Sequence, residues 1–445
     1  MNKQSRRSLA AGLLVFLIVA AVYLGFIFGA AQLDNAPATR NLIGAFESGA
    51  LSDDSTRTIA PLTGLIVADS DQYSTCVPLS LALSPAEAVF GEGPWQTGTI
   101  TCGSLREALV GAEGTQPWYR YWNGNAAILK VMLTFLPYVT VQVLVTLTLV
   151  VLLAVIAWRA RHSSKTFAVG LVVILGFGSD LLWQGMSPGV GVSSVVGLAG
   201  ALGVQEAFTR GWAARWGVVA LAGFTYASTA QMHIPIAFAV MVGMVAMLHL
   251  LGRTSPVDWR LYMVGAVATV VWVGGYVIGL LTRYLWIAMN RGGISSVTGE
   301  VGTNSPYFLS ESLSQALNGL LALLMRTWFA YGWLQIGLWF AFIIIGWSLA
   351  KGGARGWRNP EVFVAGLPLM AGVLWLLVWG RHTQHLFVNV LVSMIVLNVL
   401  FSLEVARRRA FDESGVFAQP NLVQEKTAQG TESVQAVSQA APPVN

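Results

Sequence analysis

Long apolar stretches alternate with short polar connections along most of the 445-residue chain. A bilayer core about 30 Å thick is crossed by about 20 apolar residues in a helix, so each stretch of that length is a candidate span. Such windows lie at residues 9–31, 137–157, 167–184, 189–205, 217–232, 234–251, 261–281, 333–350, 362–379 and 386–404. The pattern predicts an all-α polytopic membrane protein with about ten transmembrane helices.

The connections between these spans divide the chain into four parts. Residues 1–32 hold a short N-terminus and the first span, and residues 33–136 form a long loop domain. Residues 137–405 form the helix bundle, which a second long loop interrupts at 283–332. Residues 406–445 contain few aromatic residues and many Gln, Ala and Ser, a composition that predicts a disordered tail.

The positions of the basic residues orient the predicted spans. With the N-terminus inside, 16 of the 26 Lys and Arg residues fall in short cytoplasmic segments, against four on the outer side once the five in the long loop 33–136 are left uncounted. The first apolar run is longer than the apolar region of a signal peptide, which favours an uncleaved anchor. We therefore expect cytoplasmic N- and C-termini, two larger extracytoplasmic loops and a multi-pass location in the bacterial inner (cytoplasmic) membrane.

The composition excludes several other classes of protein. Hydrophobic residues make up 55% of the chain and charged residues 11%, against about 25% charged residues in soluble domains. A soluble enzyme and a disordered chain are thus excluded, and two cysteines are too few for a disulfide-dense secreted domain. Both cysteines, Cys76 and Cys102, lie in the first loop, where an oxidising compartment favours a disulfide over two unpaired thiols. With no histidine nearby, a metal site there is not expected.

Polar side chains collect at the extracytoplasmic ends of the spans, whereas the middle of each predicted span lacks Asp, Glu, Lys and Arg. Uncharged span centres argue against an ion-coupled transporter. The candidate site residues are Asp34, Asp71, Arg120, Tyr121, Trp122, Lys130, Asp180, Arg283, Arg381, His382 and His385. Two interpretations stay open: a site for an anionic lipid-linked substrate, or an interfacial aromatic belt with Arg and Lys extended to lipid headgroups.

Under the site hypothesis these side chains divide into two roles. Asp34 or Asp71 is the candidate general base, and His382 or His385 assists it. Guanidinium and ammonium groups bind phosphate oxygens, and aromatic rings line an acyl or polyprenyl groove. The candidate substrate-binding residues are Arg120, Tyr121, Trp122, Lys130, Asp180, Arg283 and Arg381. For Asp180 a structural ion pair or a helix-end role is an equal alternative.

Three short motifs resemble an uncharacterised family of bacterial polytopic membrane proteins. They are Arg120-Tyr121-Trp122-Asn123-Gly124 with the following Lys130, Asp71-Gln72-Tyr73-Ser74, and Arg381-His382-Thr383-Gln384-His385. Asn123 stands where the family has His. The resemblance implies a polytopic membrane fold, and it brings no biochemical activity.

The layout also resembles that of GT-C glycosyltransferases, with one span, a long outer loop, a bundle of spans and a second outer loop. Those enzymes use polyprenyl-phosphate sugars at the outer membrane face and place an acidic residue soon after the first span, where this chain has Asp34. Their usual acidic pair is absent, because Asn35 follows. The resemblance implies membrane lipids and a polyprenyl-phosphate-linked substrate as partners, with no nucleic acid and no particular cofactor indicated. The alternative is a non-catalytic carrier of lipid or glycan, or an accessory subunit of cell-envelope machinery.

Overall fold

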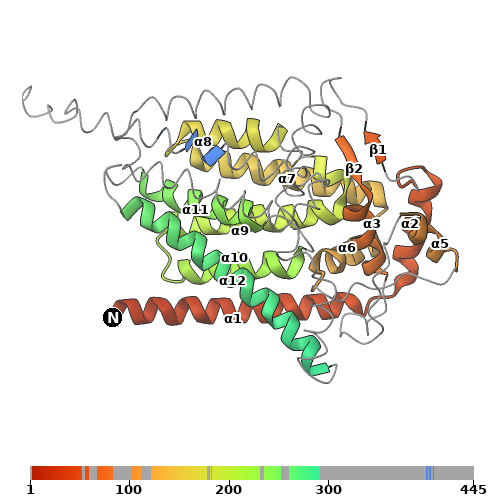
Figure 1. Cartoon of the computed structure of the whole chain (residues 1–445), viewed down its shortest axis with the longest axis horizontal. Helices are drawn as coiled ribbons and strands as arrows, with labels where there is room; N and C mark the ends of the chain where they lie inside the picture. Colours follow the sequence, from red (N-terminus) through yellow and green to blue (C-terminus); the bar gives the residue numbers. More distant parts are fainter. Residues whose placement is uncertain are drawn as a thin grey trace, which may run out of the picture.

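A computed structural model shows the protein as a bundle of roughly parallel and antiparallel helices with a smaller helical domain at one end (Figure 1). It describes residues 3–52, 56–59, 68–83, 102–111, 122–177, 181, 183–230, 235–251, 260–290, 397–398, 400–401 and 404. The predicted spans at 333–350 and 362–379, nearly all of 386–404 and the predicted tail lie outside these residues.

Among the described residues, four helices are long and apolar enough to cross a membrane. They are α1 (Lys3–Ala31), α7 (Tyr138–Ala160), α9 (Pro188–Thr209) and α12 (Arg260–Asn290). The predicted class, a helical membrane protein, is thus confirmed. A total of about ten spans and the side of the membrane on which the termini lie stay predictions.

The remaining bundle helices are shorter than the sequence windows suggested. Residues of the predicted span 167–184 form α8 (Lys165–Gly170), a π-helical segment η1 (Leu171–Phe177) and a 3₁₀ turn η2 (Trp183–Met186). Two further short helices are α10 (Arg215–Thr229) and α11 (Pro235–Leu251). Conversely, α12 continues to Asn290, so the first residues of the predicted loop 283–332 are helical.

Glycine allows α10 to pack closely between α1 and α12. A Cβ added at Gly275 would collide with the carbonyl of Ala220, and one at Gly217 would collide with the backbone of Gly12. The neighbouring Gly274 has no described atom within 4 Å of its Cβ position. Close helix approach through small residues is the usual way in which membrane helices associate, because lipid removes the hydrophobic drive between them.

Much of the predicted loop 33–136 is a folded helical domain. It contains α2 (Asn35–Glu47), α3 (Gln72–Ala82), α5 (Cys102–Leu109), α6 (Gly124–Phe135), and the strands β1 (Thr56–Ile59) and β2 (Ala68–Asp71). The strands pair antiparallel with Thr56 opposite Asp71. A disulfide between Cys76 and Cys102 joins α3 to α5, with 5.3 Å between the Cα atoms, which confirms the predicted pairing.

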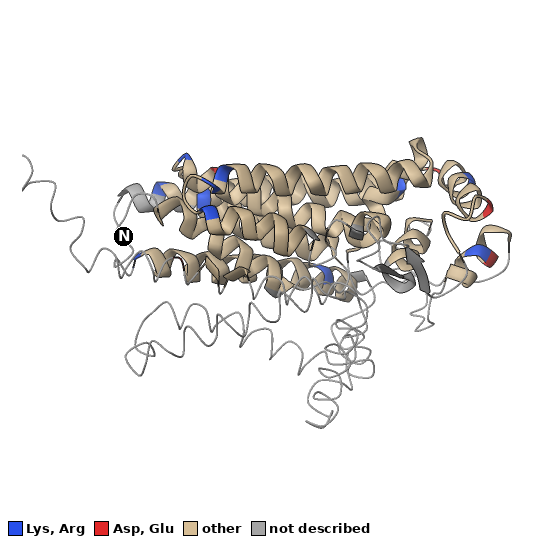
Figure 2. Ribbon diagram, turned by 90° about the horizontal axis from the view of Figure 1, so that it is seen from above, with Lys and Arg blue, Asp and Glu red and all other residues tan. Residues whose placement is uncertain are grey.

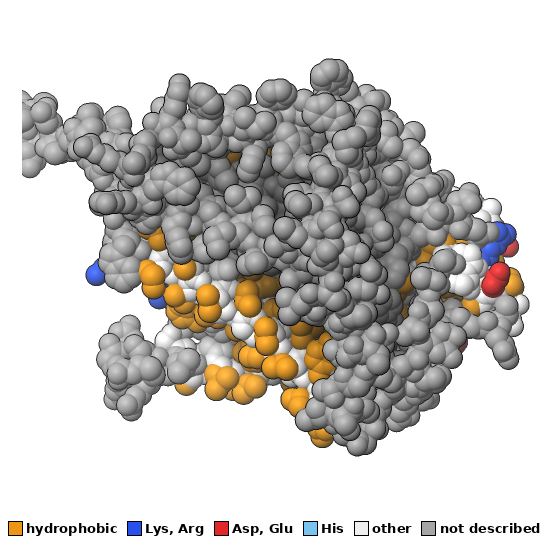
Figure 3. Space-filling model, in the orientation of Figure 1, with side chains coloured by type: hydrophobic (Ala, Val, Ile, Leu, Met, Phe, Trp, Pro, Cys, Tyr) orange, Lys and Arg blue, Asp and Glu red, His pale blue; other side chains and the backbone are white. Residues whose placement is uncertain are grey.

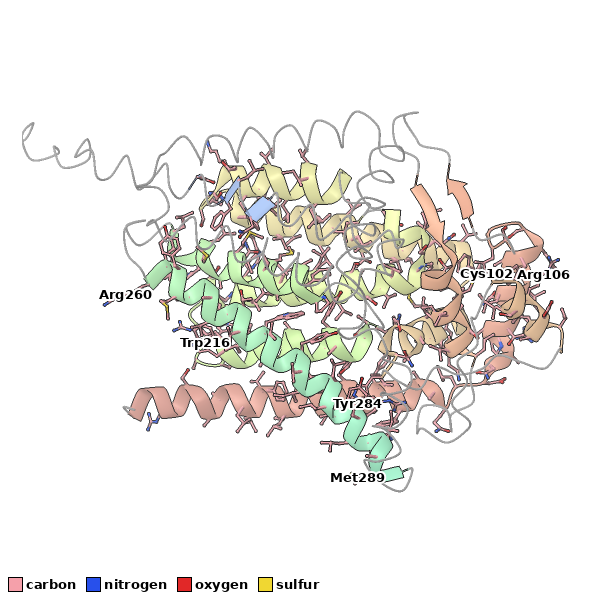
Figure 4. All side chains as sticks on the ribbon, in the orientation of Figure 1. Cys102, Arg106, Trp216, Arg260, Tyr284 and Met289 are labelled. Atoms are coloured by element: carbon pink, nitrogen blue, oxygen red, sulfur yellow. A yellow bond between two sulfur atoms is a disulfide. The ribbon has the colours of Figure 1, made fainter. Side chains whose placement is uncertain are left out.

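The two ends of the bundle differ in composition. We call the end that carries the 33–136 domain the closed end, and the end where α1 begins and α7 and α9 terminate the basic end. Lys and Arg positions gather at the basic end, whereas the closed end carries both signs of charge (Figure 2). Arg260 and Trp216 lie at the basic end, and Cys102 and Arg106 lie at the closed end (Figure 4). The described connections rich in Lys and Arg therefore share one end of the bundle with the N-terminus.

Candidate functional site

Lys130 fastens α6 to the last turn of α1 at the closed end. Its ammonium group donates a hydrogen bond of 2.9 Å to the carbonyl of Ala31, and the side chain is only 3% exposed. Burial lowers the pKa of Lys130 from its ordinary value of 10.5, and the nearby negative charge of Asp34 opposes that change. Two residues singled out from the sequence, Lys130 and Asp34, are thus brought together just beyond the first span.

Asp34 itself begins α2. Its side chain is exposed, and its Oδ1 accepts a hydrogen bond of 3.0 Å from the backbone N–H of Ala36. Asp is among the preferred residues at this position because it satisfies one of the amide groups that the first helical turn leaves unpaired. The carboxylate therefore has a structural role as the cap of α2, and its negative charge also acts on the nearby ammonium group of Lys130.

An aromatic cluster lies between α1, the start of α6 and the end of α12. We define it as Phe28, Trp122 and Trp286, whose ring centroids are 5.3 to 6.3 Å apart. The indole N–H of Trp122 donates to the carbonyl of Gly279 at 3.1 Å. The guanidinium carbon of Arg283 lies 5.0 Å from the centre of the Trp122 ring, and Arg283 is only 2% exposed. Arg283 thus makes a buried cation–π contact with Trp122.

A buried polar network lies deeper in the closed end, and the sequence did not single out its members. Thr75 donates to the hydroxyl of Ser187 at 2.8 Å, Asn125 donates to the carbonyl of Gly189 at 3.3 Å, and Gln142 donates to the carbonyl of Met186 at 2.7 Å. The bonds connect α3 and α6 to the start of α9, and α7 to the end of η2. The sequence signal that could have found Asn125 and Gln142 is a single Asn or Gln within an apolar stretch. Such a side chain is costly in a membrane protein unless it has a hydrogen-bond partner.

Asp71, the second candidate base, lies away from Asp34. It ends β2 and directly precedes α3, whereas Asn35 donates at 2.7 Å to the carbonyl of Leu83 just beyond the other end of that helix. The 11 residues of α3 extend about 16 Å. Asp71 therefore lies at the end of α3 opposite to the one that Asn35 contacts, and its role as a base stays a prediction.

The other candidates lie outside the described residues. These are Arg120, Tyr121, Asp180, Arg381, His382 and His385. The structure thus groups Asp34 with Lys130 and Arg283 with Trp122, and leaves the role of the predicted turn at 381–385 a prediction.

The closed-end site adjoins apolar surface. Large apolar side chains on the last turns of α12 are exposed, among them Leu281 at 51%, Leu285 at 54% and Met289 at 81%. Figure 3 shows apolar side chains spread over this face of the bundle, and Figure 4 places Met289 at the tip of α12. Such a surface suits contact with acyl chains, so the charged groups of the site lie beside a region fitted to lipid.

Comparisons with protein-family models, curated proteins and solved structures find no match to this chain. The class that the fold defines is a helical integral membrane protein whose folded domain covers one end of the bundle.

Proposed function

We propose that the protein is a GT-C-like membrane glycosyltransferase that acts on a polyprenyl-phosphate-linked or other lipid-linked substrate. In this proposal the closed end faces the extracytoplasmic side of the bacterial inner membrane, and the basic end faces the cytoplasm. The observation that supports it best is the proximity of Asp34, three residues after α1, to the buried ammonium group of Lys130.

The proposed chemistry assigns one role to each kind of side chain. The carboxylate of Asp34 takes the proton of an acceptor hydroxyl. The oxygen of that hydroxyl bonds to the sugar, and the bond between the sugar and the lipid phosphate breaks. Lys130 and Arg283, together with Arg120 and Arg381, stabilise the negative charge of the departing phosphate. Trp122 and Tyr121 line the path of the lipid chain, and His382 or His385 assists proton transfer.

The test separates the role of Asp34 as the cap of α2 from its proposed role as the general base. Asn also caps helices, so Asp34→Asn keeps the start of α2, with stability changed by no more than about 0.5 kcal/mol, while it removes the base. We expect the transfer of labelled sugar from polyprenyl-phosphate donors by the purified protein in vesicles to fall by about 10²- to 10⁴-fold.

The matched control is Glu47→Gln, which makes the same carboxylate-to-amide change at the exposed far end of α2. It is expected to leave transfer unchanged. If Asp34→Asn, Asp71→Asn and Arg381→Gln all fold and leave envelope glycolipids as in the wild type, the transferase proposal is wrong.

A second candidate, a non-catalytic carrier or accessory subunit of envelope machinery, is favoured by one observation. Lys130 and Trp122 each donate to a backbone carbonyl of another helix, so they hold the start of α6 against α1 and α12, while Asp34 caps α2. On this proposal Asp34→Asn is silent in every assay, whereas Lys130→Met weakens assembly of the folded protein.

A further inference from the structure

The basic end carries a cluster of cations that the proposed transferase does not use. We define the basic cluster as Arg159, Arg161 and Lys165, where α7 ends and α8 begins, and Arg210, which follows α9. Arg159 and Arg210 both form ion pairs with Glu206. Their side chains nevertheless stay 40% and 65% exposed. One carboxylate shared by two guanidinium groups leaves an excess of positive charge and several free N–H donors.

Two exposed tryptophans place this cluster at the depth of lipid headgroups. Trp158 in the last turn of α7 is 62% exposed, and Trp212 after α9 is 43% exposed. Tryptophan favours the boundary between acyl chains and water, because its ring is apolar and its N–H is polar. The guanidinium carbon of Arg161 lies 3.2 Å from the centre of the Trp158 ring, which holds that cation at the same depth.

Apolar side chains continue from the cluster toward the middle of the bundle. Val151 on α7 is 57% exposed and Val169 on α8 is 63% exposed, and these two helices are in contact. A ligand there would meet cations at its head and a valine-rich surface along its chain. Within the described residues the opposing carboxylates are Glu206, occupied by two arginines, and Glu404, which accepts a hydrogen bond from Ser164.

We propose that the basic cluster binds an anionic phospholipid, with Arg161 and Lys165 on the phosphate and the acyl chains against Val151 and Val169. Arg161 donates its Nε–H to Nε2 of His162 at 3.3 Å, which leaves the N–H groups of its two terminal nitrogens for phosphate oxygens. Basic pockets between membrane helices recognise anionic headgroups. The proposal is independent of the closed-end chemistry and of the direction in which the protein crosses the membrane.

The experiment measures binding of phosphatidylglycerol and phosphatidylcholine to the full-length protein in detergent by native mass spectrometry. The test variant carries Arg161→Gln and Lys165→Gln, positions that form no ion pair among the described residues. The control carries Arg40→Gln and Arg106→Gln, which removes the same charge at exposed positions of the closed end. We expect the test variant to bind phosphatidylglycerol about 25-fold more weakly, at about fivefold for each of the two cations removed, and the control to bind as the wild type does.

Three results would overturn the proposal: equal affinity for phosphatidylcholine, unchanged affinity in the test variant, or an equal loss in the control. A parallel arm adds inorganic phosphate at the same concentration as the lipid, and full displacement of the lipid would show that the site takes free phosphate. Should the double variant not fold, Arg161→Gln and Lys165→Gln are measured singly, each with an expected loss of about fivefold. An unchanged affinity in both single variants would then be decisive against it.

Discussion

The closed end and the basic end each contain polar contacts, of which Lys130 and Asn125 at the closed end and Arg210 at the basic end lie in opposite environments. At the closed end Lys130 and Asn125 are 3% and 0% exposed and bond to backbone carbonyls of neighbouring helices. At the basic end Arg210 is 65% exposed and pairs with another side chain, Glu206. Removing a partner costs more folding free energy for a buried polar group than for an exposed ion pair. The contacts of the closed end therefore fix how the helices pack, whereas those of the basic end mainly set the charge of that surface.

The largest effect is expected from the disulfide of the closed end. The double substitution Cys76→Ser and Cys102→Ser removes a cross-link between residues that are 26 positions apart. It should lower the free energy of unfolding by about 3 to 4 kcal/mol. Thermal unfolding of the full chain in detergent measures the loss. Reductant should lower the melting temperature of the wild type to that of the double variant and leave the variant itself unchanged. Identical melting of the oxidised wild type and the variant would show that this end does not depend on its cross-link.

An intermediate, pH-dependent effect is expected at Lys130. Its pKa is lower in the folded protein than the ordinary 10.5, so above the folded pKa the unfolded chain binds more protons. The stability contribution of Lys130 therefore increases as pH rises toward 10.5 and is constant beyond it. The stability difference between the wild type and Lys130→Met should widen over this alkaline range. Lys130→Arg is the control, because its charge does not titrate in this range. The stability difference between Lys130→Arg and Lys130→Met should stay constant over the same pH range.

The smallest effect is expected at the basic end. Glu206→Gln removes the shared partner of Arg159 and Arg210, but both arginines are already in contact with solvent. Exposed ion pairs contribute about 0 to 1 kcal/mol, so unfolding should change by less than about 1 kcal/mol. Added salt should reduce even this difference, since exposed charges are screened. A loss as large as that from the disulfide would contradict the contrast between the two ends.

The long apolar helices follow from local pattern, and the sequence windows 9–31 and 189–205 fall within α1 and α9. The folded domain at 33–136 does not follow from local pattern. Its short helices are held by a disulfide and by contacts with residues far along the chain, such as Thr75 with Ser187. Periodicity within one segment carries no information about such distant partners.

The candidate site, like the fold, follows from local sequence pattern only in part. The residue types of Asp34, Lys130, Trp122 and Arg283 marked them as candidates, because charged and aromatic groups at span ends are informative. Lys130 and Trp122 donate to the backbone carbonyls of Ala31 and Gly279, and Asp34 accepts from the backbone N–H of Ala36. Nearly every residue type can supply these backbone groups. Sequence patterns therefore indicated these side chains and could not indicate where they bind.

The start of α6 has a consequence for the order in which the protein is assembled. A Cβ at Gly124 would lie 2.7 Å from the carbonyl of Ser228 and 2.7 Å from the hydroxyl of Tyr23, so this turn is wedged between α10 and α1. Residue 124 leaves the ribosome about a hundred residues before α10 does. Helix α6 can therefore pack first against α1, α2 and α3, which precede it in the chain. Its contact with α10 forms only after later helices enter the bilayer, and a chain stopped before residue 215 would lack that contact surface.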